Sequence, residues 1–228
     1  MENKFVLITG SARGLGKELA LVFAQNGYGI ILHDRTENDL KEIKEEILKK
    51  GVPHFTVAGD LKSDKTLDDL YRISKEKGVS VLINNAGVHC PKLPLEKMDD
   101  QIIDDILLIN LVAPVKLTRR IYSMFVESGH GTIININSMS GLENQKFRTV
   151  YSASKWGLRG FSDALRLEGE ENNVRIIDIY PTRIKTRPEF TVGMESRDVA
   201  QKIYEVYKNN KLNKIILDEH SKNNGEPK

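Results

Sequence analysis

The sequence predicts a single doubly wound α/β domain around a seven-stranded parallel sheet with strand order 3-2-1-4-5-6-7. Short apolar runs alternate with longer amphipathic, charge-bearing segments along the whole chain, which is the pattern of successive βαβ units. The chain has 228 residues, a length at which one sheet covered by helices buries a single core.

The expected strands follow one another at regular intervals, with helices between them. In order, they are Phe5–Thr9, Gly29–His33, Phe55–Ala58, Val79–Asn84, Gly131–Asn137, Val174–Tyr180 and Lys214–Leu217. The helical stretches Lys17–Asn26 and Glu37–Lys50 stop near Gly27 and Gly51, which favour helix C-termini. No linker divides the chain, so we expect one domain over residues 1–220, with a disordered polar tail at residues 221–228.

The composition is that of a soluble globular protein, with 39% apolar and 29% charged residues. The net charge is only +2, which disfavours nucleic acid as a partner. No apolar stretch reaches the ~18 residues of a membrane span, and we expect no signal peptide, because the segment before Phe5 is too short for its apolar region. The single cysteine, Cys90, favours a reducing compartment, so we expect a cytoplasmic protein. No metal site is expected.

A glycine-rich turn joins the first strand to the helix that follows it. Its sequence is Thr9-Gly10-Ser11-Ala12-Arg13-Gly14-Leu15-Gly16. Such a turn lets the backbone approach a pyrophosphate, and the helix N-terminus offers free N–H groups and a positive dipole end. The context predicts a dinucleotide site, although a merely tight turn is the alternative interpretation.

Asp34 is expected at the end of the second strand, where a carboxylate can bind the adenosine ribose hydroxyls. There it would oppose the 2′-phosphate of NADP by roughly 1–4 kcal/mol at ~4 Å. Arg13 and Arg35 flank the same position and can bind a phosphate. We therefore expect NAD to be preferred over NADP, with use of both cofactors left open; an ordinary solvated aspartate is the alternative.

Tyr151 and Lys155 lie four residues apart in a helix-compatible stretch, and hence on one helix face. A free tyrosine titrates near pH 10, so acid–base work at neutral pH needs a shift of ~3 units, or ~4 kcal/mol. A lysine cation ~4 Å away supplies about that much at an effective dielectric of ~20. For the pair in isolation, an ordinary surface tyrosine and lysine is the better interpretation.

Two further polar residues strengthen the case for a catalytic site. Ser138 follows the fifth strand at the sheet edge where open α/β folds bind ligands, and its hydroxyl can hold a substrate oxygen against Tyr151. Asn110 lies in the apolar helical pattern Ile102–Val115 and needs a buried hydrogen-bond partner. It is either part of a proton relay or a residue that satisfies a helix kink.

With these pieces in order, the sequence resembles the short-chain dehydrogenase/reductase family from about Phe5 to Leu217, which implies a Rossmann domain. The matching motifs are Thr9-Gly10-x-x-x-Gly14-x-Gly16, Asp60-Leu61, Asn84-Asn85-Ala86-Gly87, Asn110, Ser138, Tyr151-x-x-x-Lys155 and Pro181-x-x-Ile184-x-Thr186.

The resemblance implies a role for each matching residue. Tyr151 is the acid/base, Lys155 binds the nicotinamide ribose and depresses the tyrosine pKa, Ser138 polarises the substrate oxygen, and Asn110 holds a water of the relay. Asp60 and Leu61 face the adenine, Asn85 and Gly87 line the cofactor cleft, and Ile184 and Thr186 contact the carboxamide. Apart from the resemblance, the turn and the end of the second strand add Gly10, Arg13, Gly14, Leu15, Gly16, Asp34 and Arg35 to the expected cofactor contacts. Family members form dimers or tetramers through the helices that here carry Ile102–Val126 and Tyr151–Glu168.

The chain departs from the family pattern in two places. Pro181-Thr182 stands where Pro-Gly is usual, which removes a backbone freedom beside the nicotinamide. The segment between Thr186 and the last helix is short, which predicts an open substrate cleft.

We therefore expect an NAD(P)-dependent oxidoreductase that moves a hydride between a nicotinamide and a secondary alcohol or ketone, and that assembles as a homodimer or homotetramer. An NADPH-dependent 3-oxoacyl-thioester reductase is the alternative that Arg13 and Arg35 favour. The alternative from another class is a nicotinamide-sensing binding protein with little turnover. The segments that would line the substrate pocket have no recognisable sequence pattern, so the substrate is not identified. The candidates for contact with it are Glu143, Gln145, Phe147 and Arg148.

Overall fold

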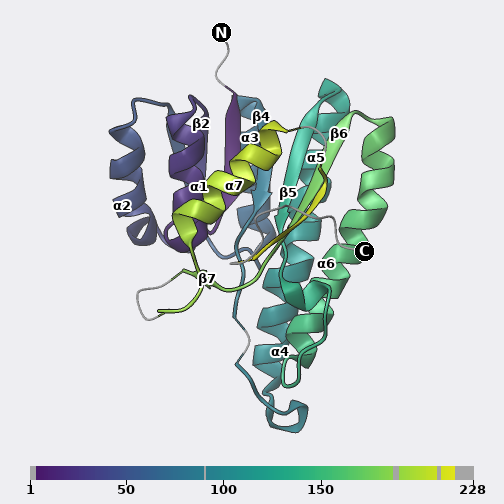
Figure 1. The fold of residues 1–228 in the computed structure, drawn as a ribbon. Helices are drawn as coiled ribbons and strands as arrows, with labels where there is room; N and C mark the ends of the chain where they lie inside the picture. The colour runs from purple at the N-terminus through teal and green to yellow at the C-terminus, as the bar shows by residue number, and fades with distance from the viewer. Residues whose placement is uncertain (1–3, 90, 187–189, 210–211, 219–228) are drawn as a thin grey trace.

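The computed structural model describes residues 4–89, 91–186, 190–209 and 212–218 (Figure 1). Its main sheet has seven parallel strands in the order β3-β2-β1-β4-β5-β6-β9, which confirms the predicted sheet and its order. The strands are β1 (Phe5–Thr9), β2 (Gly29–Asp34), β3 (His54–Ala58), β4 (Val79–Asn84), β5 (Gly131–Ile136), β6 (Val174–Pro181) and β9 (Lys214–Leu217). Each predicted strand agrees with its counterpart within one residue at either end.

A second, two-stranded sheet was not predicted. It pairs β7 (Ile184–Lys185) with β8 (Met194–Glu195), in parallel, beyond the end of β6. Two-residue strands leave no periodic pattern in a sequence. The predicted tail, residues 221–228, lies outside the described residues.

Helices cover both faces of the sheet, as a doubly wound fold requires. On one face lie α1 (Gly14–Gln25), α2 (Glu37–Leu48) and α7 (Ser196–Lys208); on the other lie α3 (Asp64–Lys77), α5 (Ala113–Ser128) and α6 (Thr149–Glu171). Alternate strand residues point to opposite faces, so Val6 and Ile8 join the core under the first layer, whereas Phe5 and Leu7 join the core under the second. Gly27 and Gly51, with φ of 82° and 72°, follow α1 and α2 as predicted.

The helix predicted over 102–115 is interrupted. It consists of α4 (Asp100–Leu107), the π-helical segment η2 (Leu108–Val112) and the start of α5, and α4 packs beside α6 near the bottom of Figure 1. Pro114 explains the interruption, because proline has no N–H to offer the carbonyl of Asn110 four residues earlier and its ring clashes with that carbonyl. The wider π turn relieves this conflict.

A buried polar network ties two neighbouring strands, β4 and β5, to the second helix layer. Asn84 Nδ2 donates to Asn135 Oδ1 (2.8 Å) and to Thr118 Oγ1 (2.9 Å), and Asn135 Nδ2 donates to Ser162 Oγ (2.9 Å). Because each strand or helix contributes a member, the bonds favour one arrangement of these elements over alternatives.

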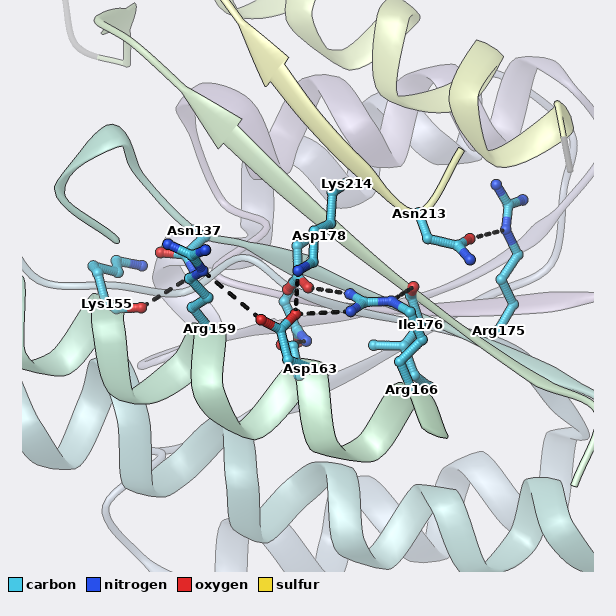
Figure 2. Close-up of polar contacts among 12 residues, drawn as sticks. Asn137, Lys155, Arg159, Asp163, Arg166, Arg175, Ile176, Asp178, Asn213 and Lys214 are labelled. Atoms are coloured by element: carbon cyan, nitrogen blue, oxygen red, sulfur yellow. Dashed lines mark hydrogen bonds and ion pairs between the residues drawn. The ribbon is translucent and has the colours of Figure 1, made fainter. Parts of the chain in front are cut away.

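Asp178 of β6 is completely buried, and its carboxylate pairs with Arg166 of α6 at 2.5 Å (Figure 2). Burial raises the pKa of the Asp178 carboxyl to about 6, while Ser162 and Arg166 limit the rise. Arg166 also bonds Asp163 of α6 at 2.8 Å, and Lys214 of β9 contacts Asp163 at 2.7 Å. These ion pairs hold α6 against the last two strands of the sheet.

In the part of the chain that the structure describes, every helix is too short or too polar to cross a membrane.

Candidate active site

The glycine-rich turn is packed so tightly that side chains are excluded from it. Gly10 has φ of 66°, and a Cβ there would lie 2.9 Å from the Cα of Ala86. A Cβ on Gly16 would collide with the carbonyl oxygen of Gly10. Asn85 Nδ2 donates to the carbonyls of Thr9 and Gly10, both at 2.9 Å, and so fixes the turn. The predicted residues Gly10, Gly16 and Asn85 therefore form one rigid unit at the start of α1.

Two hydroxyl groups, those of Thr9 and Ser11, fix the turn through hydrogen bonds to neighbouring backbone groups. The sequence had indicated no role for either of them. Thr9 Oγ1 accepts hydrogen bonds from the backbone N–H groups of Asn85 and Ala86, both at 3.1 Å. Ser11 is fully buried, and its Oγ accepts a hydrogen bond from His33 N at 3.0 Å. The position of small hydroxyl residues between buried strands is the signal that would have pointed to them.

Asp34 lies at the mouth of this turn, as predicted. Its Oδ2 accepts a hydrogen bond from Ala12 N (3.1 Å) and its Oδ1 accepts one from Arg35 N (2.9 Å), so the carboxylate is held in place by backbone groups. The side chains of Arg13 and Arg35 are exposed beside it. The carboxylate is thus a fixed feature of the site, while both guanidinium groups are free to adjust.

The neighbouring strand β3 ends next to Asp34. Gly59 N donates to the carbonyl of Asp34 at 3.0 Å, which places the following Asp60 and Leu61 at the same sheet edge. Asp60 is exposed, and its Oδ1 accepts a hydrogen bond from Lys62 N at 2.9 Å. Leu61 is only 6% exposed and packs in the core under the second helix layer.

The segment after β6 returns to the glycine turn. A Cβ on Gly14 would lie 2.9 Å from the carbonyl oxygen of Thr186, so these two residues are in contact. Ile184 is half-buried against the core under the first helix layer. The structure therefore brings Ile184 and Thr186 to the predicted cofactor residues. The predicted open cleft involves residues 187–189, which lie outside the described residues, and it stays a prediction.

Asn110 is 1% exposed, and its side chain has the buried partner that the sequence required. Its Oδ1 accepts a hydrogen bond from Val88 N at 2.8 Å and its Nδ2 donates to Val88 O at 3.1 Å. Gly87 lies against the same amide, since a Cβ there would be 3.2 Å from Asn110 Oδ1. The side chain is therefore occupied in joining η2 to the loop after β4.

Tyr151 and Lys155 lie one turn apart on α6, as predicted, and the Lys155 Nζ is 5.9 Å from the centre of the tyrosine ring. Lys155 is only 6% exposed, and its Nζ donates to the carbonyl of Ile136 at 3.0 Å. Burial lowers the pKa of the Lys155 ammonium to about 8. Lys155 is thus a buried cation rather than a surface lysine.

Asn137 joins this helix to the end of β5, and the sequence reasoning missed it. Its Oδ1 accepts a hydrogen bond from Ser138 N (2.9 Å), and its Nδ2 donates to the carbonyl of Lys155 (3.3 Å; Figure 2). Ser138 Oγ accepts a hydrogen bond from Ser140 N at 3.2 Å and keeps its own proton for donation. One asparagine therefore sets the relative position of Ser138 and Lys155.

Two more side chains flank the Tyr151 ring. The guanidinium carbon of Arg148 lies 5.7 Å from the ring centre, and the His89 ring centre lies 6.5 Å from it. Arg148 comes one turn before Tyr151, directly ahead of α6.

Comparison with known proteins identifies the family. The family model described as short chain dehydrogenase matches residues 4–193. The chain belongs to the short-chain dehydrogenase family. As a member of it, the protein is an oxidoreductase that depends on NAD or NADP.

Three relatives illustrate the range of this short-chain dehydrogenase's similarity. The 3-oxoacyl-acyl-carrier-protein reductase FabG of Buchnera aphidicola is 32% identical over 82% of this chain and 75% of that protein. Dehydrogenase/reductase SDR family member 7B of Mus musculus is 35% identical over 82% of this chain but only 59% of its own length. A metagenomic short-chain oxidoreductase solved in complex with NADP is 26% identical with a TM-score of 0.84, over 94% of this chain and 96% of that one.

The residues of this short-chain dehydrogenase fit a nicotinamide dinucleotide. The turn before α1 excludes side chains, so its backbone can approach a pyrophosphate. The carboxylate of Asp34, which is predicted to bind the ribose hydroxyls, is held beside this turn by backbone N–H groups. The buried cation of Lys155 and the hydroxyls of Tyr151 and Ser138 lie near the carboxyl ends of the strands, where ligands bind in such sheets.

Proposed function

We propose that the protein interconverts a ketone and a secondary alcohol, with Tyr151 as the acid/base. The observation that carries this proposal is the placement of Tyr151 beside the buried cation of Lys155, on a helix that Asn137 joins to Ser138. A bound nicotinamide supplies or accepts the hydride. Tyr151 donates its proton to the developing alkoxide, and the ammonium of Lys155 favours the tyrosinate that results. Ser138 donates a hydrogen bond to the same substrate oxygen.

Lys155 needs a source of protons to restore Tyr151, and we propose that η2 provides the route. Pro114 gives no N–H to the carbonyl of Asn110. We propose that this carbonyl binds a water that links Lys155 to solvent. The Asn110 side chain, fixed by Val88, then serves to hold the backbone of η2 in place.

The test is a panel of alcohols and ketones followed at the nicotinamide absorbance with both cofactors. Turnover of a ketone that is lost in Tyr151→Phe supports the proposal. Binding of a cofactor without turnover of any member of the panel would contradict it and favour a sensing role.

We further propose that NAD is preferred over NADP, with Asp34 binding the adenosine ribose. Its carboxylate is held by Ala12 N and Arg35 N, so it cannot easily move away from a 2′-phosphate bound there. The NADP complex of the metagenomic relative, together with Arg13 and Arg35, favours the opposite choice. We give the carboxylate more weight because it is fixed and the two arginines are exposed.

Replacing Asp34 with alanine should raise the ratio of kcat/KM for NADP to that for NAD by about fivefold or more, since it removes a repulsion of roughly 1–4 kcal/mol. The measurement is steady-state kinetics with each cofactor. Glu37→Ala, which removes an exposed carboxylate three residues further on, is the matched control and should leave the ratio unchanged. An unchanged ratio in Asp34→Ala would exclude the residue from the ribose site.

A 3-oxoacyl-thioester reductase that uses NADPH is the second candidate. The similarity to the FabG protein of Buchnera aphidicola and the two exposed arginines beside the turn favour it. Turnover of a 3-oxoacyl thioester with NADPH, at a kcat/KM above that for simple ketones with NADH, would establish it over the first.

We also propose that the protein is a homodimer or homotetramer that associates through α5 and α6. These helices expose apolar side chains, with Val126 39%, Trp156 42% and Leu167 68% accessible. Light scattering at micromolar concentration should give a dimer or tetramer mass, and Leu167→Glu should lower it. A monomer mass for the unaltered protein would refute the assembly.

A further inference from the structure

We propose that Arg148 is an anion-binding residue of the active site, so that the substrate is a short oxo acid or hydroxy acid whose carboxylate pairs with the Arg148 guanidinium. This inference rests on the proposed function and adds the substrate class to it.

The position of the Arg148 side chain is the first argument. Its guanidinium carbon lies 5.7 Å from the centre of the Tyr151 ring, which is within the range of a cation–π contact. The residue is half-buried, and its Nε is buried without a hydrogen-bond partner among the residues that the structure describes. A buried donor without a partner costs free energy, so a ligand that accepts from it is favoured.

The charge around Tyr151 is the second argument. Two cations lie near the same ring, since the guanidinium carbon of Arg148 is 5.7 Å and the Nζ of Lys155 is 5.9 Å from its centre. Within the described ranges, no carboxylate is close enough to pair with either of them. Proton transfer produces only one negative charge, the tyrosinate. A substrate carboxylate would balance the second cation.

The geometry limits the size of the substrate. A guanidinium holds a carboxylate at N–O distances of about 2.7–2.9 Å and in a planar, two-point contact. Tyr151 holds the reacting oxygen at about 2.6–3.2 Å. Because Arg148 and the Tyr151 ring are in contact, the carboxylate and the ketone must be neighbouring groups of one short molecule. A 2-oxo or 3-oxo acid meets this requirement, whereas a neutral ketone leaves Arg148 unpaired.

The experiment compares short 2-oxo and 3-oxo acids with their methyl esters, in the full-length protein with its preferred nicotinamide. In the unaltered protein, kcat/KM for at least one acid should exceed that for its ester by ~30-fold or more, as expected for a buried charge pair. Arg148→Met should remove this preference by lowering kcat/KM for the acid alone, and Arg148→Lys should retain part of it. Lys146→Met, which removes an exposed cation from the same loop, is the matched control and should change neither value.

Two results would overturn the inference. One is an unaltered protein that uses esters or neutral ketones as well as it uses every acid of the panel. The other is an equal loss for acid and ester in Arg148→Met, which would place Arg148 with the residues that tune Tyr151. In both cases Tyr151-dependent turnover of the neutral compounds leaves the proposed function intact. If Tyr151→Phe left all turnover unchanged, the proposed function itself would be wrong.

Discussion

Replacing Tyr151 with phenylalanine should lower kcat for ketone reduction by at least about 100-fold and leave cofactor affinity nearly unchanged. A positioned proton donor contributes roughly 10²–10⁴-fold to such a reaction. Phenylalanine keeps the ring that lies beside Lys155 and Arg148 but has no proton to give. The measurements are kcat with saturating cofactor and the dissociation constant of the reduced nicotinamide from its fluorescence.

Tyr122→Phe is the matched control for that experiment. The Tyr122 hydroxyl accepts a hydrogen bond from Asn172 at 3.1 Å, at the end of α6 away from Tyr151. The Tyr122→Phe substitution should therefore have no effect on kcat. A Tyr151→Phe protein that retained more than a few per cent of kcat would require another acid/base for the reaction.

Replacing Arg166 with methionine should lower the free energy of unfolding by about 3–5 kcal/mol, because it leaves a buried carboxylate without its partner. Asp178 is completely buried, and its Oδ1 has no hydrogen-bond partner in the described part of the chain. Urea unfolding followed by circular dichroism measures the change.

Two further variants show whether the loss of stability in Arg166→Met comes from the buried pair with Asp178 or from removal of any arginine. Arg120→Met breaks ion pairs to the exposed carboxylates of Asp64 and Asp68 and should cost less than about 1 kcal/mol. In the double variant Arg166→Met with Asp178→Asn, most of the lost stability should return, since no buried charge remains. If Arg166→Met cost no more than Arg120→Met, Asp178 would not depend on its partner.

The same pair predicts a pH dependence. The pKa of Asp178 is about 6 in the folded protein and near 3.9 in the unfolded chain, so the folded state binds the proton more tightly. The contribution of Asp178 to stability is therefore largest below pH 4 and is lost as the pH rises through 6. In Arg166→Met the destabilisation should be greatest above pH 6 and should shrink in acid, whereas Asp178→Asn should remove this dependence.

The sheet was predictable because its central strands are largely buried on both faces and carry apolar runs, such as Phe5–Thr9. The helices were harder to delimit. The pattern of Ile102–Val115 is helical throughout, and only Pro114 indicates that the hydrogen bonding changes at η2. The sheet of β7 and β8 had no signal, since each strand has two residues.

The site residues were predictable where their spacing has a chemical use, as with Tyr151 and Lys155, or where only glycine leaves room for a close neighbour, as with Gly16. The residues that position them were not predictable. Asn137 and Ser11 act through side-chain bonds to residues 18 and 22 positions away, and no local pattern encodes these partners. The sequence named Arg148 as a candidate contact, but only the structure places its guanidinium against Tyr151.

The contact between Lys214 and Asp163 has a consequence for the order in which the protein assembles as it is synthesised. Asp163 lies on the helix that carries Tyr151, whereas Lys214 is 51 residues later in the chain. On the ribosome, where the N-terminal part emerges first, α6 must wait for β9 before its ion pairs with the sheet are complete. The helix that bears the catalytic tyrosine is therefore among the last elements to be secured, and a nascent chain should gain activity only after its final strand has docked.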